Sequence, residues 1–257
     1  MTYCPSIAKI AEECFTEYAL DFPVSQKTTY KIGGNADGAL FPDTANKATA
    51  VVKRLKEEGV PFVFLGNGSN VLISDEGFRG AVVCSERLKG ITVSGKMLTA
   101  LSGEPLSSVI KTALYSSLGG LEFLSGIPAS VGGAVSMNAG CYGKNVGDYV
   151  SYVVTTSGVL PQKDCGFDYR ESVFSVGDDM ILSVCFNLEN VEFEQSEAAI
   201  EKFLKLRAKK TPKGRSCGSV FKNDGYFAGK LIEQSGMKGV SVGGATVSEK
   251  HANFIIA

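Results

Sequence analysis

The sequence predicts an α+β protein, and three observations carry that prediction. Segments with the apolar spacing of helices and short apolar runs typical of strands both occur along the 257 residues, without the strict alternation of a doubly wound sheet. A composition of 44% hydrophobic and 21% charged residues is that of a globular protein. A long stretch of small residues at 126–147 interrupts the pattern. Glycines clustered in this way indicate that the backbone lies close to a ligand or to another segment of the chain.

The length suits two or three small lobes. We expect lobes at residues 1–80, 81–190 and 191–257, with the last boundary in the polar run at 190–199.

The elements of the first lobe follow from local spacing. Residues 6–20 read as a short amphipathic helix. Asp43 or Thr44 is expected to cap a second helix that runs to about Glu58. The apolar run at 60–65 follows as a buried strand. In the later lobes we expect strands at 81–84, 91–93, 97–101, 150–156 and 180–188, and helices at 105–118 and 196–209.

Two glycine-rich segments predict a site for a ligand that carries phosphate. GNGSN at 66–70 follows a buried strand, so successive N–H groups can converge on an anion while Ser69 and Asn70 add side-chain donors. It matches neither the G-x-G-x-x-G nor the G-x-x-x-x-G-K-[ST] pattern. GIPASVGGAVSMNAG at 126–140 has too many glycines for a stable helix interior and suits backbone lying against a flat aromatic ligand. The alternative for the first segment is a simple glycine-rich turn, and the alternative for the second is close packing of backbone against backbone.

Charge, hydropathy and cysteine usage exclude several classes of protein. A net charge of −1 gives no basic field for nucleic acid or an anionic membrane. No apolar run reaches the roughly 18–20 residues of a membrane span, and the acidic N-terminus is unlike a signal peptide. Seven scattered cysteines without a C-x-x-C pair suit a reducing cytoplasm, and a single histidine, His251, argues against a metal site. We therefore expect a cytoplasmic protein. We also expect a monomer, although these features do not determine the oligomeric state.

Six ordered motifs together resemble one family, the UDP-N-acetylenolpyruvoylglucosamine reductases. The motifs are T-x-Y-K-I-G-G at 28–34, GNGSN at 66–70, GIPASVGGAV at 126–135, MNAGCYG at 137–143, DYRESVF at 168–174 and CGSVFKN at 217–223. The resemblance implies a vanillyl-alcohol oxidase/p-cresol methylhydroxylase type of flavin fold, with FAD held non-covalently between two small α/β lobes and a third lobe covering the substrate. The interval between the last two motifs is typical of the shorter class without an extra tyrosine-bearing loop.

The resemblance also implies a reaction and its ligands. NADPH gives hydride to the flavin, which passes it to UDP-N-acetylglucosamine enolpyruvate, and a proton completes the reduction to UDP-N-acetylmuramate for peptidoglycan synthesis. The glycine segments and one arginine are implied to bind FAD. These residues are Gly66, Asn67, Gly68, Ser69, Asn70, Pro128, Ser130, Val131, Gly133, Ala134, Gly140 and Arg207.

The implied catalytic residues are Arg170 and Ser219. Hydride addition develops negative charge on the substrate carboxylate, which a planar guanidinium can bind bidentately. Ser219 is the implied proton donor, since proximity can substitute for a matched pKa. A salt bridge of Arg170 to Glu171 or Asp168, and a turn role for Ser219, are the structural alternatives.

Tyr169, Lys210 and Asn223 are implied substrate contacts, although Lys210 and Asn223, like Arg207, could equally be solvated surface groups. The family pattern also has a catalytic glutamate beyond H-A-N-F-I, whereas this sequence ends at Ala257. We expect this sequence to be either a truncated form or a natural variant of the family pattern.

Two alternatives to this function follow from the sequence. One is an oxidase of the same fold with covalent flavin, for which only Cys141 is available. The other is a catalytically impaired protein that binds flavin or a nucleotide sugar.

Overall fold

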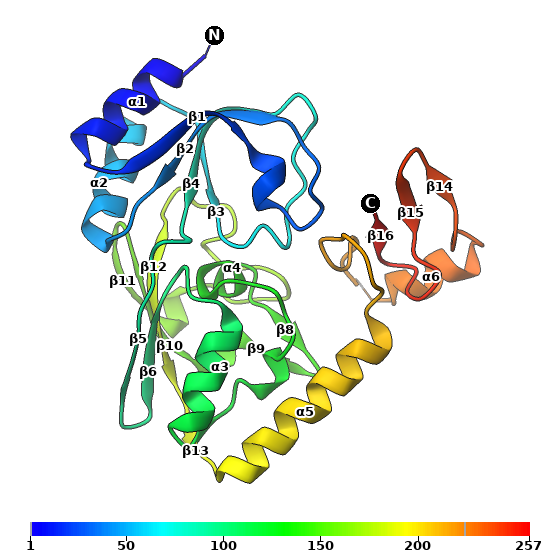
Figure 1. Ribbon diagram of the computed structural model, residues 1–257. Helices are drawn as coiled ribbons and strands as arrows, with labels where there is room; N and C mark the ends of the chain where they lie inside the picture. The colour runs from blue at the N-terminus through cyan, green and yellow to red at the C-terminus, as the bar shows by residue number, and fades with distance from the viewer. Residues whose placement is uncertain (1, 224) are drawn as a thin grey trace.

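The computed structural model describes residues 2–223 and 225–257 and has three lobes (Figure 1). Lobe 1 is built on a four-stranded sheet in the order β1-β2-β4-β3, in which β2, β4 and β3 are parallel and β1 is antiparallel. Two helices, α1 and α2, pack on this sheet. The bounds are α1 Cys4–Glu13, β1 Glu17–Pro23, β2 Asn35–Phe41, α2 Ala45–Glu57, β3 Phe62–Leu65 and β4 Phe78–Cys84.

Local signals explain both the success and the failure of the predictions for lobe 1. The second helix starts where predicted, because the Thr44 side chain accepts a hydrogen bond of 3.3 Å from the Lys47 N–H. The predicted helix at 6–20 is wrong beyond Glu13, since Phe15 has a φ of 50° and the chain then enters β1. Strand β2 was not predicted; flanked by β1 and β4, it forms despite its Asn, Asp and Gly content.

Lobe 2 is built on a five-stranded sheet in the order β11-β10-β12-β6-β5, with every neighbouring pair antiparallel. The helices α3 and α4 pack against it over an apolar core. The bounds are β5 Ile91–Ser94, β6 Met97–Leu101, α3 Leu106–Tyr115, α4 Val131–Ser136, β10 Val150–Thr155, β11 Gly158–Pro161 and β12 Ile181–Asn187. Two short ribbons complete the lobe, β7 Leu118–Gly119 with β13 Glu189–Asn190 and β8 Gly140–Cys141 with β9 Lys144–Asn145.

The short helix α4 corrects the prediction that glycine excludes a helix from this stretch. The Ser130 hydroxyl caps it by accepting from the Gly133 N–H at 3.3 Å. A Cβ at Gly132 would lie 2.9 Å from the Ser102 Cβ, so glycine here allows the helix to approach its neighbour. Tertiary packing therefore outweighs the low intrinsic propensity of these residues.

Lobe 3 is the smallest and is joined to the rest by a long helix, α5 (Figure 1). It contains α6 and a three-stranded antiparallel sheet in the order β14-β15-β16. The bounds are α5 Phe193–Lys210, α6 Ala228–Gln234, β14 Ser241–Val242, β15 Ala245–Val247 and β16 Ile255–Ile256.

The structure shifts both predicted lobe boundaries. The boundary after residue 80 lies inside β4, which belongs to the sheet of lobe 1 through Cys84. The boundary after residue 190 separates α5 from lobe 2, yet Ile200 and Phe203 of this helix pack against the core of that lobe. Lobe 3 proper therefore begins after α5.

Asp37 is a buried carboxylate that fixes the N-terminal helix to the sheet. Its Oδ2 accepts from the Tyr3 N–H at 3.2 Å, and its Oδ1 accepts from Arg79 at 2.9 Å. Burial by itself raises the pKa of Asp37, but the bonds from Tyr3 and Arg79 outweigh it, and the pKa is lowered.

A lowered pKa links Asp37 to stability at acid pH. The contribution is fully present above the unfolded-state pKa of about 3.9 and is lost as pH falls through the folded-state value. We expect Asp37→Asn to lower the free energy of unfolding by about 1–3 kcal/mol at neutral pH, because a neutral side chain binds the charged Arg79 and the Tyr3 N–H more weakly. The variant should also lose less stability than the natural protein between about pH 5 and pH 2. Urea unfolding across this range would contradict the assignment if both proteins showed the same pH dependence.

Candidate active site

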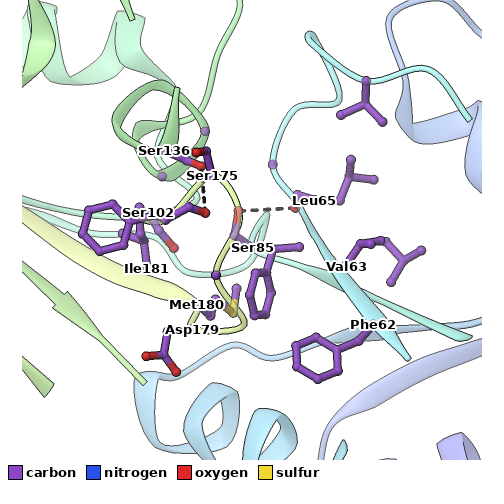
Figure 2. A pocket seen from close by; sticks show the side chains of 18 of the residues that line it. Phe62, Val63, Leu65, Ser85, Ser102, Ser136, Ser175, Asp179, Met180 and Ile181 are labelled. Carbon is purple, nitrogen blue, oxygen red and sulfur yellow. Dashed lines mark hydrogen bonds between the residues drawn. The ribbon is translucent and has the colours of Figure 1, made fainter. Parts of the chain in front are cut away.

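A cavity of about 420 Å³ opens between lobes 1 and 2. Figure 2 shows Phe62, Val63 and Leu65 of β3 on one side of it and Ser102 and Ile181 on the other. The wall from β3 is apolar, whereas lobe 2 contributes serine hydroxyls. An apolar slot with a few placed hydroxyls suits a flat aromatic ligand that also carries polar groups.

The two glycine segments predicted from the sequence meet at this cavity. The Asn67 side chain donates to the Pro128 carbonyl oxygen at 3.3 Å. A Cβ at Gly66 would overlap the Ser130 hydroxyl, so the backbone at Gly66 approaches the Ser130 side chain more closely than a residue with a side chain would allow. Gly66 and Gly133 both line the cavity.

Gly68 gives the GNGSN loop its shape. Its φ of 61° lies in the left-handed region, and a Cβ there would overlap the carbonyl oxygen of Lys27. The Gly68 carbonyl in turn accepts from the Thr29 N–H at 3.1 Å. The loop is therefore held against the segment around residue 28 by contacts that only glycine permits.

Ser102 is an unexpected feature of the cavity wall. Its side chain is buried, yet its hydroxyl has no hydrogen-bond partner among residues 2–223 and 225–257. Buried polar groups without partners are rare and costly. Because Ser102 lines the cavity, its hydroxyl is a candidate to bond a polar group of a bound ligand, and no sequence pattern indicated it.

The remaining predicted cofactor residues fall into two groups. Val131 and Ala134 point into the core of lobe 2, so their contact with a cofactor would come from backbone. The Arg207 Nε donates to the Ser125 carbonyl at 2.9 Å, which anchors α5 to the glycine segment. Contact of Arg207 with a flavin phosphate stays a prediction, as do those of Ser69, Asn70 and Gly140.

Cys141 has little of the character of a reactive thiol. Burial raises its pKa, and the nearby positive charge of Arg207 offsets this only in part. The Arg207 guanidinium donates to its sulfur at 3.4 Å. A raised pKa disfavours the thiolate that covalent attachment of a flavin would need.

Arg170 occupies a strained turn beside the glycine segment. Its φ is 59°, a conformation that costs a bulky residue about 1–2 kcal/mol. One guanidinium nitrogen donates to the Gly140 carbonyl at 2.7 Å. No carboxylate within the described ranges forms an ion pair with Arg170, and Glu171 instead lies 4.0 Å from Lys222. The strain and the unpaired charge both suit a functional role better than a structural salt bridge.

Ser219 and Asn223 line a second cavity, of about 290 Å³, in lobe 3. The Asn223 N–H donates to the Tyr169 hydroxyl at 3.2 Å, which brings the two predicted catalytic segments together across lobes 2 and 3. Lys210, at the end of α5, lines neither cavity. Sequence reasoning missed Asn253, whose buried side-chain amide bonds both the N–H and the carbonyl of Phe221 at 2.9 Å.

Comparison with known proteins agrees with this geometry. The family model described as the C-terminal domain of UDP-N-acetylenolpyruvoylglucosamine reductase matches residues 209–257, and an FAD binding domain matches residues 36–161. The reductase of Geobacillus kaustophilus is 42% identical over 256 residues, which cover 96% of this chain and 84% of that protein. This chain belongs to the UDP-N-acetylenolpyruvoylglucosamine reductase family.

Other reductases of the family and more distant flavoproteins extend the comparison. The reductase of Caldanaerobacter subterraneus is 39% identical over 244 residues, covering 92% of this chain and 81% of that protein. The crystal structure of the Thermus caldophilus reductase superposes with a TM-score of 0.81 at 31% identity, over 94% of this chain and 87% of that one. A solvent-stable cholesterol oxidase, 12% identical with a TM-score of 0.54, shares the fold over 68% of this chain and 38% of that chain.

These matches confirm the predicted family, flavin fold and FAD, and none supports the catalytically impaired alternative. Among the described residues, no helix has the length and apolar character needed to cross a membrane. Within the same ranges, no cluster of three or more His, Cys, Asp or Glu side chains could hold a metal ion.

Gly68→Ala tests the loop. The substituted residue would be strained by about 1–2 kcal/mol and would also collide with Lys27. Gly59→Ala is a matched control, because its φ is also 61° but nothing lies within 4 Å of the added Cβ. We expect both variants to lose similar stability from strain, while only Gly68→Ala lowers FAD affinity, by about tenfold or more. Fluorescence titration of the apoprotein with FAD measures this, and equal affinities in the two variants would contradict it.

Ser102→Ala tests the buried hydroxyl. Removing a group without a partner should leave the apoprotein as stable as before or more stable. The same change should weaken FAD binding by about 2–10-fold, the equivalent of one lost hydrogen bond. Ser125→Ala is the control, since its hydroxyl is also buried without a partner in the described ranges but does not line the cavity. If Ser125→Ala weakens FAD binding as much as Ser102→Ala, the contact is excluded.

Proposed function

We propose that this protein reduces UDP-N-acetylglucosamine enolpyruvate to UDP-N-acetylmuramate with NADPH, a step of peptidoglycan synthesis. The observation that carries the proposal is the contact between the Asn223 N–H and the Tyr169 hydroxyl, at 3.2 Å. It joins the two segments that resemble the family's catalytic motifs, 168–174 and 217–223. Family membership supplies the substrate class, as the names of the relatives state it.

The reaction needs fixed positive charge beside the carboxylate of the substrate. FAD, when bound, would supply the redox chemistry, carrying hydride from NADPH to the terminal carbon of the enolpyruvyl group. Negative charge then develops on the carboxylate, and the Arg170 guanidinium is our candidate to bind it. One guanidinium nitrogen of Arg170 bonds the Gly140 carbonyl, and this bond orients the other nitrogens of the group. The positive charge therefore needs little reorganisation during the reaction.

A proton must reach the carbon next to the one that receives hydride. We assign this step to the Ser219 hydroxyl, which lines the cavity of lobe 3. A serine is a weak acid, but the carbon that it protonates is strongly basic and held close. Asn223, in the same cavity, is our candidate to bind the diphosphate or the carboxylate, and Tyr169 supports it through the contact described above. Lys210 is a candidate for the same anions.

Two further assignments remain proposals. The seven cysteines are all free thiols, which suits a reducing compartment, and we place the protein in the cytoplasm. We also propose a monomer, which size-exclusion chromatography with light scattering would test.

Half-reaction kinetics test the proposed function. We expect purified protein to oxidise NADPH only when the enolpyruvyl sugar nucleotide is added. In Ser219→Ala, reduction of the flavin by NADPH should stay near the natural rate, while its reoxidation by the substrate should slow by about 10²–10⁴-fold through loss of the acid. Ser241→Ala, an exposed serine of β14, is the control and should leave both rates unchanged. Equal slowing of both half-reactions in Ser219→Ala would assign Ser219 a structural role.

A further inference from the structure

We propose that Thr29 is a positioning residue, whose hydroxyl holds the Ser219 segment of lobe 3 in register with the GNGSN loop of lobe 1. The inference rests on the proposed role of Ser219 and goes beyond it, because Thr29 touches neither cavity. The geometry that points to it is a chain of contacts running from one loop to the other.

Thr29 is bonded to both sides of the junction. Its backbone N–H donates to the Gly68 carbonyl at 3.1 Å, inside the GNGSN loop. Its hydroxyl donates at 2.8 Å to the carbonyl of Ser216, a residue 187 positions further along the chain. The Gly68 carbonyl also lies 3.4 Å from this hydroxyl, but the shorter distance makes Ser216 the better acceptor. One residue thus joins the GNGSN loop, through its backbone, to a point three residues before Ser219, through its hydroxyl.

The other end of the Ser219 segment is fixed inside lobe 3. The Asn253 carbonyl accepts from the Val220 N–H at 3.0 Å, and its side chain bonds both backbone groups of Phe221. Between the two anchors lies Gly218, with a φ of 85°. Ser219 therefore sits on a short segment tied at one end to lobe 1 and at the other to the interior of lobe 3.

Tyr30 makes a parallel contact next to Thr29. Its buried hydroxyl donates to the Ile255 carbonyl at 3.2 Å, in β16. Burial and then the neighbouring Cys217 thiol raise the pKa of Tyr30 to about 12, so the hydroxyl keeps its proton and remains a donor at neutral pH. Two adjacent side chains of lobe 1 therefore both hold lobe 3 through backbone oxygens.

The register between the two loops decides the relative placement of hydride and proton. The proposed reaction delivers them to adjacent carbons of one substrate, and misplacement of a reacting group by about 1 Å can cost about 10²-fold. Loss of the Thr29 hydroxyl should therefore slow the proton step and leave reduction of the flavin by NADPH intact.

The test compares Thr29→Val, which removes the hydroxyl at nearly constant volume, with Thr29→Ser, which keeps it. Thr49→Val is the matched control, since the Thr49 hydroxyl bonds only the Ala45 carbonyl within α2. We expect Thr29→Val to keep FAD, because its N–H still binds Gly68. Flavin reduction by NADPH should be unchanged, and reoxidation by the enolpyruvyl sugar nucleotide should slow by about 10–10²-fold. Thr29→Ser should restore most of the rate, and Thr49→Val should match the natural protein.

A double-mutant cycle separates positioning from a general structural role. If Thr29 acts through Ser219, adding Thr29→Val to Ser219→Ala should slow reoxidation little further. Additive losses, or natural reoxidation in Thr29→Val, would overturn the proposal while leaving the proposed function in place.

Hydrogen exchange gives a readout that does not need turnover. In FAD-loaded Thr29→Val, amides of residues 216–221 should exchange faster than in the natural protein and in Thr49→Val. Unchanged exchange together with unchanged rates would show that Thr29 does not hold the segment. Failure of the natural protein to reduce the substrate would overturn the proposed function alone, since the exchange result still decides whether Thr29 holds the segment.

Discussion

The close approach of the GNGSN loop to the start of α4 is the constraint on which the rest of the site depends. Gly66 lies so near the Ser130 hydroxyl that no side chain fits between them, and Asn67 bonds the Pro128 carbonyl across the gap. Two lobes with separate sheets are thereby fixed with their glycine segments face to face. The cavity beside this contact is lined by residues of both lobes, so neither lobe alone forms it.

Lobe 3 is held in a different way, by one helix and a few side chains. Helix α5 packs on lobe 2 through Ile200 and Phe203 and is anchored there by Arg207. Beyond its end, Thr29 and Tyr30 reach across from lobe 1. Few contacts cross this junction compared with the packed core of lobe 2, and such junctions open at lower free energy than cores. We therefore expect lobe 3 to move more readily than the two lobes that meet at the cavity.

Local patterns predicted what depends on neighbours in sequence, such as the cap at Thr44 and a strand within 60–65. That strand runs from Phe62 to Leu65, and the prediction that it is buried is wrong, because only Leu65 is buried. They missed β2, because its stability comes from strands β1 and β4 on either side rather than from its own residues. The same division holds at the site. The motifs predicted the loops. Ser102 stands out only because its buried hydroxyl has no partner within the described residues, and Thr29 only because its hydroxyl bonds a residue 187 positions away.

Three of the contacts that hold α5 and lobe 3 in place share one chemical feature. Thr29, Tyr30 and Arg207 donate to the backbone oxygens of Ser216, Ile255 and Ser125, and a carbonyl oxygen is present whatever side chain its residue carries. Sequence drift at the accepting positions can therefore leave the junction unharmed, while drift at the donating positions breaks it. An evolving family of such proteins would vary freely on one side of each junction and narrowly on the other, so paired covariation would be a poor guide to where its lobes touch.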